Sequence, residues 1–105
     1  MFTIKELIRV LRSGRVWVTD HADEEAYNDR LTYEDIFGSV VAGEIIEEYP
    51  EDRPYPSCLI CGNSPKGEPV HSVWAYNGDT QSAVLVTVYR PDPAKWTNWK
   101  IRRNR

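Results

Sequence analysis

The spacing of the apolar residues changes once along this chain, at Gly43, and that change limits the folds open to it. Before Gly43, apolar residues recur every three or four positions, as on one face of a helix. After Gly43 they fall in short runs rich in β-branched and aromatic residues, which are typical of strands. Helices first and strands afterwards, with short connections, favour an α+β fold. We therefore expect N-terminal helices packed on one face of a four-stranded, mainly antiparallel sheet.

Local signals set the bounds of the expected elements. Thr3 and Glu6 have capping-box spacing, Gly14 can end a helix in the left-handed conformation, and Thr32 begins a further helix. The expected helices span residues 4–13, 19–27 and 32–43, and residues 15–18 form a short extended link. The expected strands span residues 44–49, 57–61, 70–76 and 83–89. Turn residues separate these strands, which predicts an antiparallel meander.

The length and composition are those of a single domain. A chain of 105 residues with 41% hydrophobic residues can bury one core, so we expect residues 1–105 to form one domain. No run of about 18 apolar residues is present, and the N-terminus lacks the pattern of a signal peptide. We expect a cytoplasmic protein with no membrane contact.

Cys58 and Cys61 have the spacing of a metal or redox pair, but the rest of the chain does not support either use. Structural zinc needs four ligands, and strand alternation would place the two thiols on opposite sheet faces. A redox pair would sit at the start of a helix, whereas this pair lies in an expected strand. We expect two buried cysteines, no metal and no cofactor.

Charge is divided between the two ends of the chain. Acidic residues crowd positions 20–52, while a basic, Trp-containing segment occupies residues 92–105, and the net charge is −3. Such a division can mark a surface for nucleic acid or for an acidic partner, although a solubilising tail has the same composition. The candidate nucleic-acid contacts are Arg90, Lys100, Arg102, Arg103 and Trp96. Alternatively, the tryptophan anchors the C-terminal segment on the core.

Two histidines suggest a chemistry for this surface. His21 lies in the first turn of an expected helix, where the positive end of the dipole favours a neutral imidazole that can accept a proton. His71 begins an expected strand, and Arg30 follows the second helix. Two imidazoles and a guanidinium suit metal-independent RNA cleavage, in which a base, an acid and a cation act on one phosphate. Alternatively, both histidines make structural hydrogen bonds.

Ordered motifs along the chain resemble a known family. They are Thr19-Asp-His-Ala22, Arg30, Thr32, the run 44–50 (EIIEEYP), the run 56–59 (PSCL), Gly62, Pro69-Val-His71 and Val86-Thr-Val-Tyr89. In this order and spacing they resemble the domain-of-unknown-function family numbered 4258. The resemblance covers nearly the whole chain. Cys61 departs from it, because an aliphatic residue is expected there.

The resemblance carries functional expectations by analogy. Members of that family are similar in layout to RelE-like and barnase-like toxin ribonucleases of bacterial toxin-antitoxin pairs, often encoded beside a zinc-finger antitoxin. The resemblance implies that the polar residues matching the family's pattern are His21, Arg30, His71 and Tyr89, with Thr87 a weaker match. The acidic net charge is a second departure, because such toxins are usually basic.

Two hypotheses follow for the function. The first is a metal-independent endoribonuclease toxin, in which His21 and His71 share acid-base work, Arg30 or Arg103 contacts phosphate and Tyr89 positions the substrate. The second is a non-catalytic module that binds protein or RNA through its acidic helices or its basic tail, which accounts for the charge division directly.

Overall fold

A computed structural model describes residues 1–104 of the chain. Its elements in chain order are α1 (Ile4–Ser13), β1 (Val16–Val18), α2 (Asp20–Asn28), α3 (Tyr33–Val41), β2 (Glu44–Tyr49), β3 (Ser57–Asn63), β4 (Pro69–Asn77), β5 (Ser82–Tyr89), β6 (Trp96–Thr97) and β7 (Ile101–Arg102). The α+β class and the three helices agree with the sequence-based prediction. None of the helices within residues 1–104 is long and apolar enough to cross a membrane.

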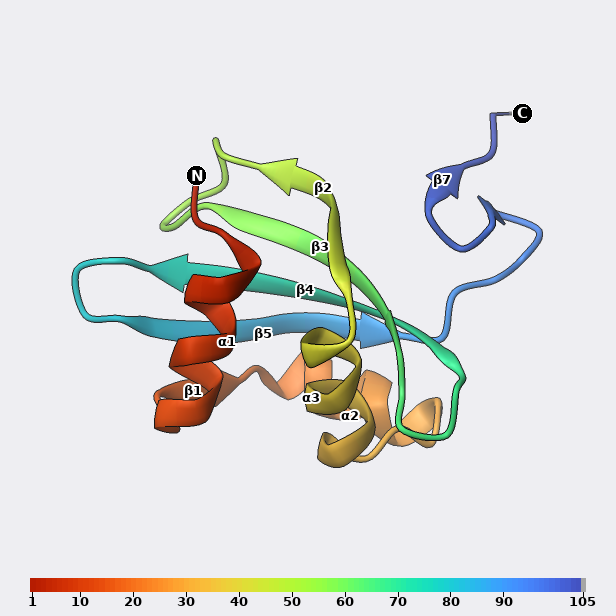
Figure 1. Cartoon of the computed structure of the whole chain (residues 1–105), viewed down its shortest axis with the longest axis horizontal. Coiled ribbons are helices and arrows are strands. Elements are labelled where there is room, and N and C mark those ends of the chain that lie inside the picture. Colours follow the sequence, from red (N-terminus) through yellow and green to blue (C-terminus); the bar gives the residue numbers. More distant parts are fainter. Residues whose placement is uncertain (105) are drawn as a thin grey trace.

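The main sheet has five strands rather than the four that we predicted. Its order is β1-β5-β4-β3-β2, and β2 to β5 form the expected antiparallel meander (Figure 1). The added strand is β1, which pairs in parallel with β5 and makes the sheet mixed. Residues 15–18 were expected to be only a link, because a three-residue strand has too few positions to show alternation and its partner lies far along the chain.

The helices begin where their capping residues place them. Thr3 accepts a hydrogen bond from the backbone N–H of Glu6, whose carboxylate accepts from the N–H of Thr3, and Gly14 ends α1 with a φ of 81°. Thr32 and Asp35 form the same reciprocal cap on α3. These caps satisfy backbone donors that would otherwise lack partners, so they fix the ends of α1 and α3.

The three helices cover one face of the main sheet. Leu7 of α1 and Ile36 of α3 pack in one cluster with Trp74 of β4 and Leu85 of β5, and all four side chains are fully buried. Cys58 belongs to the same cluster. Because side chains alternate along a strand, the residues between these core positions point to the opposite face, which we call the second face.

Close packing between α3 and the meander depends on two glycines. A Cβ atom built on Gly62 would lie 1.8 Å from the carbonyl oxygen of Ser39, and one built on Gly43 would lie 2.5 Å from the same oxygen. Real Cβ atoms do not approach an oxygen this closely. The last turn of α3 can therefore rest directly on β3 only because these two positions lack a side chain.

This contact generates a stability prediction. Gly62→Ala should lower the free energy of unfolding by about 3 kcal/mol or more, because backbone must move to admit the methyl group. The matched control is Gly14→Ala, where nothing lies within 4 Å and the cost is only that of a left-handed alanine, about 1 kcal/mol. Urea unfolding of the three proteins measures both effects. Equal losses would contradict the role of the close contact.

The C-terminal hairpin, residues 95–103, follows the end of β5 and contains β6 and β7 (Figure 1). Asn98 and Trp99 both have positive φ, of 52° and 68°, and the N–H of Lys100 donates to the carbonyl of Thr97 at 3.1 Å. Positive φ at both central residues is typical of a type I′ β-turn. This turn carries the carbonyl group of Trp99 to the second face of the sheet.

Candidate functional site

His71 is the buried polar centre of the second face. It lies in one cross-strand row with Cys61 of β3 and Tyr89 of β5, and its side chain is 0% exposed. Its Nδ1 lies 3.1 Å from the hydroxyl of Tyr89, and its Nε2 lies 2.6 Å from the carbonyl oxygen of Trp99. The imidazole therefore joins the main sheet to the C-terminal hairpin.

The hydrogen-bond partners of His71 determine which of its ring nitrogens carries the proton. A carbonyl oxygen can only accept, so Nε2 carries the proton and donates to Trp99, while Nδ1 accepts from the hydroxyl of Tyr89. Burial lowers the pKa of His71, outweighing the Trp99 carbonyl and the charge of Glu47, which raise it. Burial also raises the pKa of Tyr89, so the hydroxyl keeps its proton. His71 is thus a neutral, fully bonded imidazole.

Trp96 fixes the hairpin against the same histidine. Its ring meets that of His71 edge-on with centroids 4.5 Å apart, and the guanidinium carbon of Arg102 lies 4.6 Å from the centre of the indole. The tryptophan is 4% exposed. This burial agrees with an anchoring role, and it leaves no open indole face on which a base could stack.

Two ion pairs hold the hairpin to β2. Arg102 Nε donates to Glu47 at 2.8 Å, and Lys100 Nζ lies 2.7 Å from a carboxylate oxygen of Glu44. Burial alone would raise the pKa of Glu47, but the hydrogen bonds from Arg102 and from the hydroxyl of Tyr49 outweigh it and lower that pKa. Burial and the same bond raise the pKa of Tyr49 to about 12. Glu47 is therefore ionised at neutral pH.

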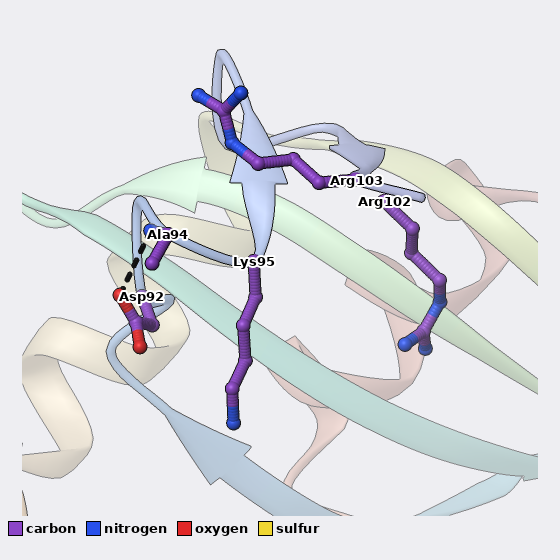
Figure 2. A pocket seen from close by; sticks show the side chains of 5 residues that line it. All are labelled: Asp92, Ala94, Lys95, Arg102 and Arg103. Carbon is purple, nitrogen blue, oxygen red and sulfur yellow. Dashed lines mark hydrogen bonds between the residues drawn. The ribbon is translucent and has the colours of Figure 1, made fainter. Parts of the chain in front are cut away.

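Two adjoining cavities lie beside this anchored hairpin. One, of about 620 Å³, is lined by Asp92, Ala94, Lys95, Arg102 and Arg103. The other, of about 340 Å³, is lined by Tyr89, Arg90, Asp92, Lys95, Trp96 and Arg102. Figure 2 shows Lys95 and Arg102 extending to the same side of the hairpin and Arg103 to the other side. The two cavities share two cationic side chains and a carboxylate.

The two histidines do not come together. His21 is exposed in the first turn of α2, in the helical layer, whereas His71 is enclosed on the second face. Within residues 1–104, no hydrogen bond or ion pair involves the side chain of His21 or Arg30. Of the four residues implied for catalysis, only His71 and Tyr89 are in contact. Thr87 lies on the second face opposite Val73 of β4.

Arg90 serves the fold at the end of β5. Its backbone N–H and its Nε donate to Asp29, and its guanidinium also pairs with Glu68 at 2.8 Å. A further bond reaches the carbonyl of Arg30. Although Arg90 borders one cavity, its donors are largely committed to the loop between α2 and α3.

The cysteines are separated as predicted. Cys58 packs in the core beneath the helices, and Cys61 lies on the second face beside His71. Burial, with a smaller effect of Glu48, raises the pKa of Cys58 to about 12. Within residues 1–104, no group of three His, Cys, Asp or Glu side chains is arranged to hold a metal ion.

Sequence reasoning did not identify Glu47 or Tyr49 as members of the site. Glu47 and Tyr49 alternate on β2, which indicates a shared face, but their link to Arg102 depends on how the hairpin folds back. Lys95, which also lines both cavities, lies beside Trp96 in the basic segment that the sequence singled out.

Comparison with known proteins identifies the family. The family described as Domain of unknown function (DUF4258) matches residues 18–90, which is more than half of the chain. The chain belongs to this family. No curated protein and no solved structure matches it. In this DUF4258 chain, His21, His71 and Tyr89 lie inside the matched residues, whereas α1 and the C-terminal hairpin lie outside them.

The burial of His71 predicts a dependence of stability on pH. Its folded pKa is lowered, so the unfolded chain binds more protons, and stability falls as pH drops below about 6.5. Each unit of lowering is worth about 1.4 kcal/mol. His71→Gln should lose less stability than the wild type between about pH 7 and pH 5. Urea unfolding at several pH values across this range measures the free energy of unfolding of both proteins. Parallel dependences of this free energy on pH would contradict a buried neutral histidine.

Proposed function

We propose that this DUF4258 protein binds single-stranded RNA along the C-terminal hairpin, with one phosphate at Lys95 and another at Arg103, which extend to opposite sides of the hairpin. The observation that carries this proposal is the presence of two uncommitted cations there. Within residues 1–104, neither Lys95 nor Arg103 forms an ion pair, and both are exposed. Arg103 Nε donates to the carbonyl of Pro93 at 3.0 Å, which leaves the terminal nitrogens of its guanidinium for a phosphate.

The shape of the site supports a flexible strand as the ligand. The cations project from a short hairpin and not from a helix that could enter a duplex groove. Tyr89 lines the adjoining cavity and offers an aromatic ring beside the cations, a combination that suits an unstacked base next to its phosphate. The resemblance to toxin ribonucleases favours RNA over DNA.

The acidic net charge is compatible with this proposal because the charges are separated in space. Exposed acids of α2 and α3, including Asp20, Asp23 and Glu34, belong to the helical layer, whereas the hairpin lies on the second face. At physiological salt, exposed charges farther apart than about 8 Å are largely screened from each other. The local charge at the hairpin therefore matters more for phosphate than the total of −3.

Binding is tested by removing the two uncommitted cations. Lys95→Ala with Arg103→Ala should weaken binding of an oligouridine and lower the slope of log affinity against log salt by about 1.4, which is about 0.7 for each lost phosphate contact. Fluorescence anisotropy at several salt concentrations gives both quantities. The control, Arg53→Ala with Lys66→Ala, has the same net charge and changes exposed loop residues. Equal affinity and slope in the two double variants would contradict the site.

A second candidate function is metal-independent RNA cleavage at the same place. The observation that favours it is Tyr89, a residue that lines a cation-bearing cavity and whose hydroxyl contacts His71. In such a step the 2′-oxygen attacks phosphorus, its proton passes to a water molecule, and the 5′-oxygen leaves with a proton from the Tyr89 phenol once that hydroxyl turns from His71. Lys95 with Arg102 can stabilise the charge on phosphorus. The role expected for His21 has no geometric support, since His21 lies in the helical layer.

Cleavage is tested separately from binding. In the presence of EDTA, the wild type should cut a mixed-sequence RNA, and Tyr89→Phe should cut it about 100-fold more slowly when each protein is assayed at a concentration where anisotropy reports full binding. Gel analysis of end-labelled RNA measures the rate, and Lys66→Ala serves as the active control. Intact RNA under conditions where anisotropy reports full binding would leave a binding module without nuclease activity.

A toxin role and a zinc-finger antitoxin belong with this second candidate and remain predictions. An RNA-cutting toxin needs an inhibitor in the cell that makes it. Growth arrest upon induction of the wild type, but not of Tyr89→Phe, would support that role.

A further inference from the structure

A second basic surface lies on α1, in the helical layer. Lys5, Arg9 and Arg12 follow one another at spacings of four and three residues, which places them on one face of the helix. With Ile8 and with Val41 at the end of α3, they line a hollow of about 440 Å³. We call this surface the α1 groove.

The cations of the α1 groove are uncommitted. Lys5, Arg9 and Arg12 are exposed, and among residues 1–104 none of them forms an ion pair or a side-chain hydrogen bond. In contrast, Arg90, Lys100 and Arg102 near the C-terminus each pair with an acid of the chain. In a protein with a net charge of −3, the unpaired positive charge is therefore concentrated on α1 as much as at the hairpin.

The basic surface continues past the end of the helix. Arg9 also borders a second hollow, of about 340 Å³, lined by Arg9, Val10, Ser13, Arg15 and Gln81. Arg15 donates to the carbonyl of Thr80, which holds its stem along the β4–β5 turn. From Lys5 to Arg12, α1 rises by about 10 Å. This length matches two turns of a partner helix.

Apolar groups lie among these cations. Val41 is 52% exposed at the end of α3, and Ile8 is half-buried beside it. Among residues 1–104, no aromatic side chain lines the α1 groove, so these residues offer no platform for a base. Aliphatic contacts flanked by cations complement an amphipathic helix with an apolar stripe and acidic flanks. These features favour a protein segment over RNA.

We propose that the α1 groove is a docking site for an acidic, amphipathic helical segment of a partner protein. The charge complementarity of Lys5, Arg9 and Arg12 would select the acidic flanks, and Ile8 with Val41 would receive the apolar stripe. The groove lies on the opposite side of the sheet from the C-terminal hairpin, so a bound partner leaves the proposed RNA site uncovered. The proposal does not depend on RNA binding.

The test uses a labelled helical peptide with leucines on one face and glutamates on both flanks. Fluorescence anisotropy compares the wild type with Lys5→Gln, Arg9→Gln and Arg12→Gln combined, in which glutamine keeps the helix propensity. The matched control combines Lys66→Gln, Lys95→Gln and Arg103→Gln, which has the same net charge. We expect about tenfold weaker peptide binding in the α1 variant and unchanged binding in the control. A copy of the peptide with lysine in place of glutamate should not bind.

Val41→Glu provides an independent variant at one exposed position with every cation retained. This substitution should also weaken binding of the peptide, because it places a carboxylate where the apolar stripe of the peptide would pack. The oligouridine is measured against the same proteins, and its affinity should fall only in the variant lacking Lys95 and Arg103. Failure of the wild type to bind the acidic peptide, or equal binding by the α1 variant, overturns the proposal. Loss of oligouridine binding in the α1 variant would assign the groove to nucleic acid instead.

Discussion

The candidate site depends on one buried imidazole, that of His71, which connects the main sheet to the C-terminal hairpin. His71 donates to the carbonyl of Trp99 and accepts from the hydroxyl of Tyr89, so both of its nitrogens are satisfied without water. Leaving either partner unpaired in a buried position would cost about 1–3 kcal/mol. The C-terminal hairpin has only two short strands of its own and depends on the main sheet for its position. Arg102 and Lys95 reach the cavity walls because the hairpin is held there.

Much of the fold follows from local signals in the sequence. The caps at Thr3 and Thr32 and the left-handed stop at Gly14 fix helix ends through hydrogen bonds within a few residues. The meander follows from turn residues between runs of β-branched and aromatic side chains, and its four strands lie within two residues of the predicted bounds. The opposite orientations of Cys58 and Cys61 follow from strand alternation alone.

The parts that sequence reasoning missed depend on distant contacts. The strand β1 exists only because Val16–Val18 lies beside Ala83–Leu85, a parallel pairing with no local pattern. The hairpin's return to the sheet requires Trp99 in a left-handed conformation, which is uncommon for a bulky residue. His21 and His71 are separated because they belong to different layers, whereas the sequence-based hypothesis combined them on the chemistry of their side chains. The cations of α1 lie on one helical face that the sequence pattern already indicates. The sequence-based prediction of a binding surface nevertheless considered only the basic C-terminal segment and the acidic helices.

The central claim is that His71 holds the C-terminal hairpin on the sheet, and amide hydrogen exchange tests it most directly. In the wild type, the amides of Lys100 and Arg103, which donate to Thr97 and Lys95, should exchange slowly. In His71→Phe they should lose about tenfold protection, the equivalent of one hydrogen bond of about 1.4 kcal/mol, while the amides of Ile60 and Trp74 in the central strands stay protected. Unchanged protection at Lys100 and Arg103 would contradict the anchoring role of His71.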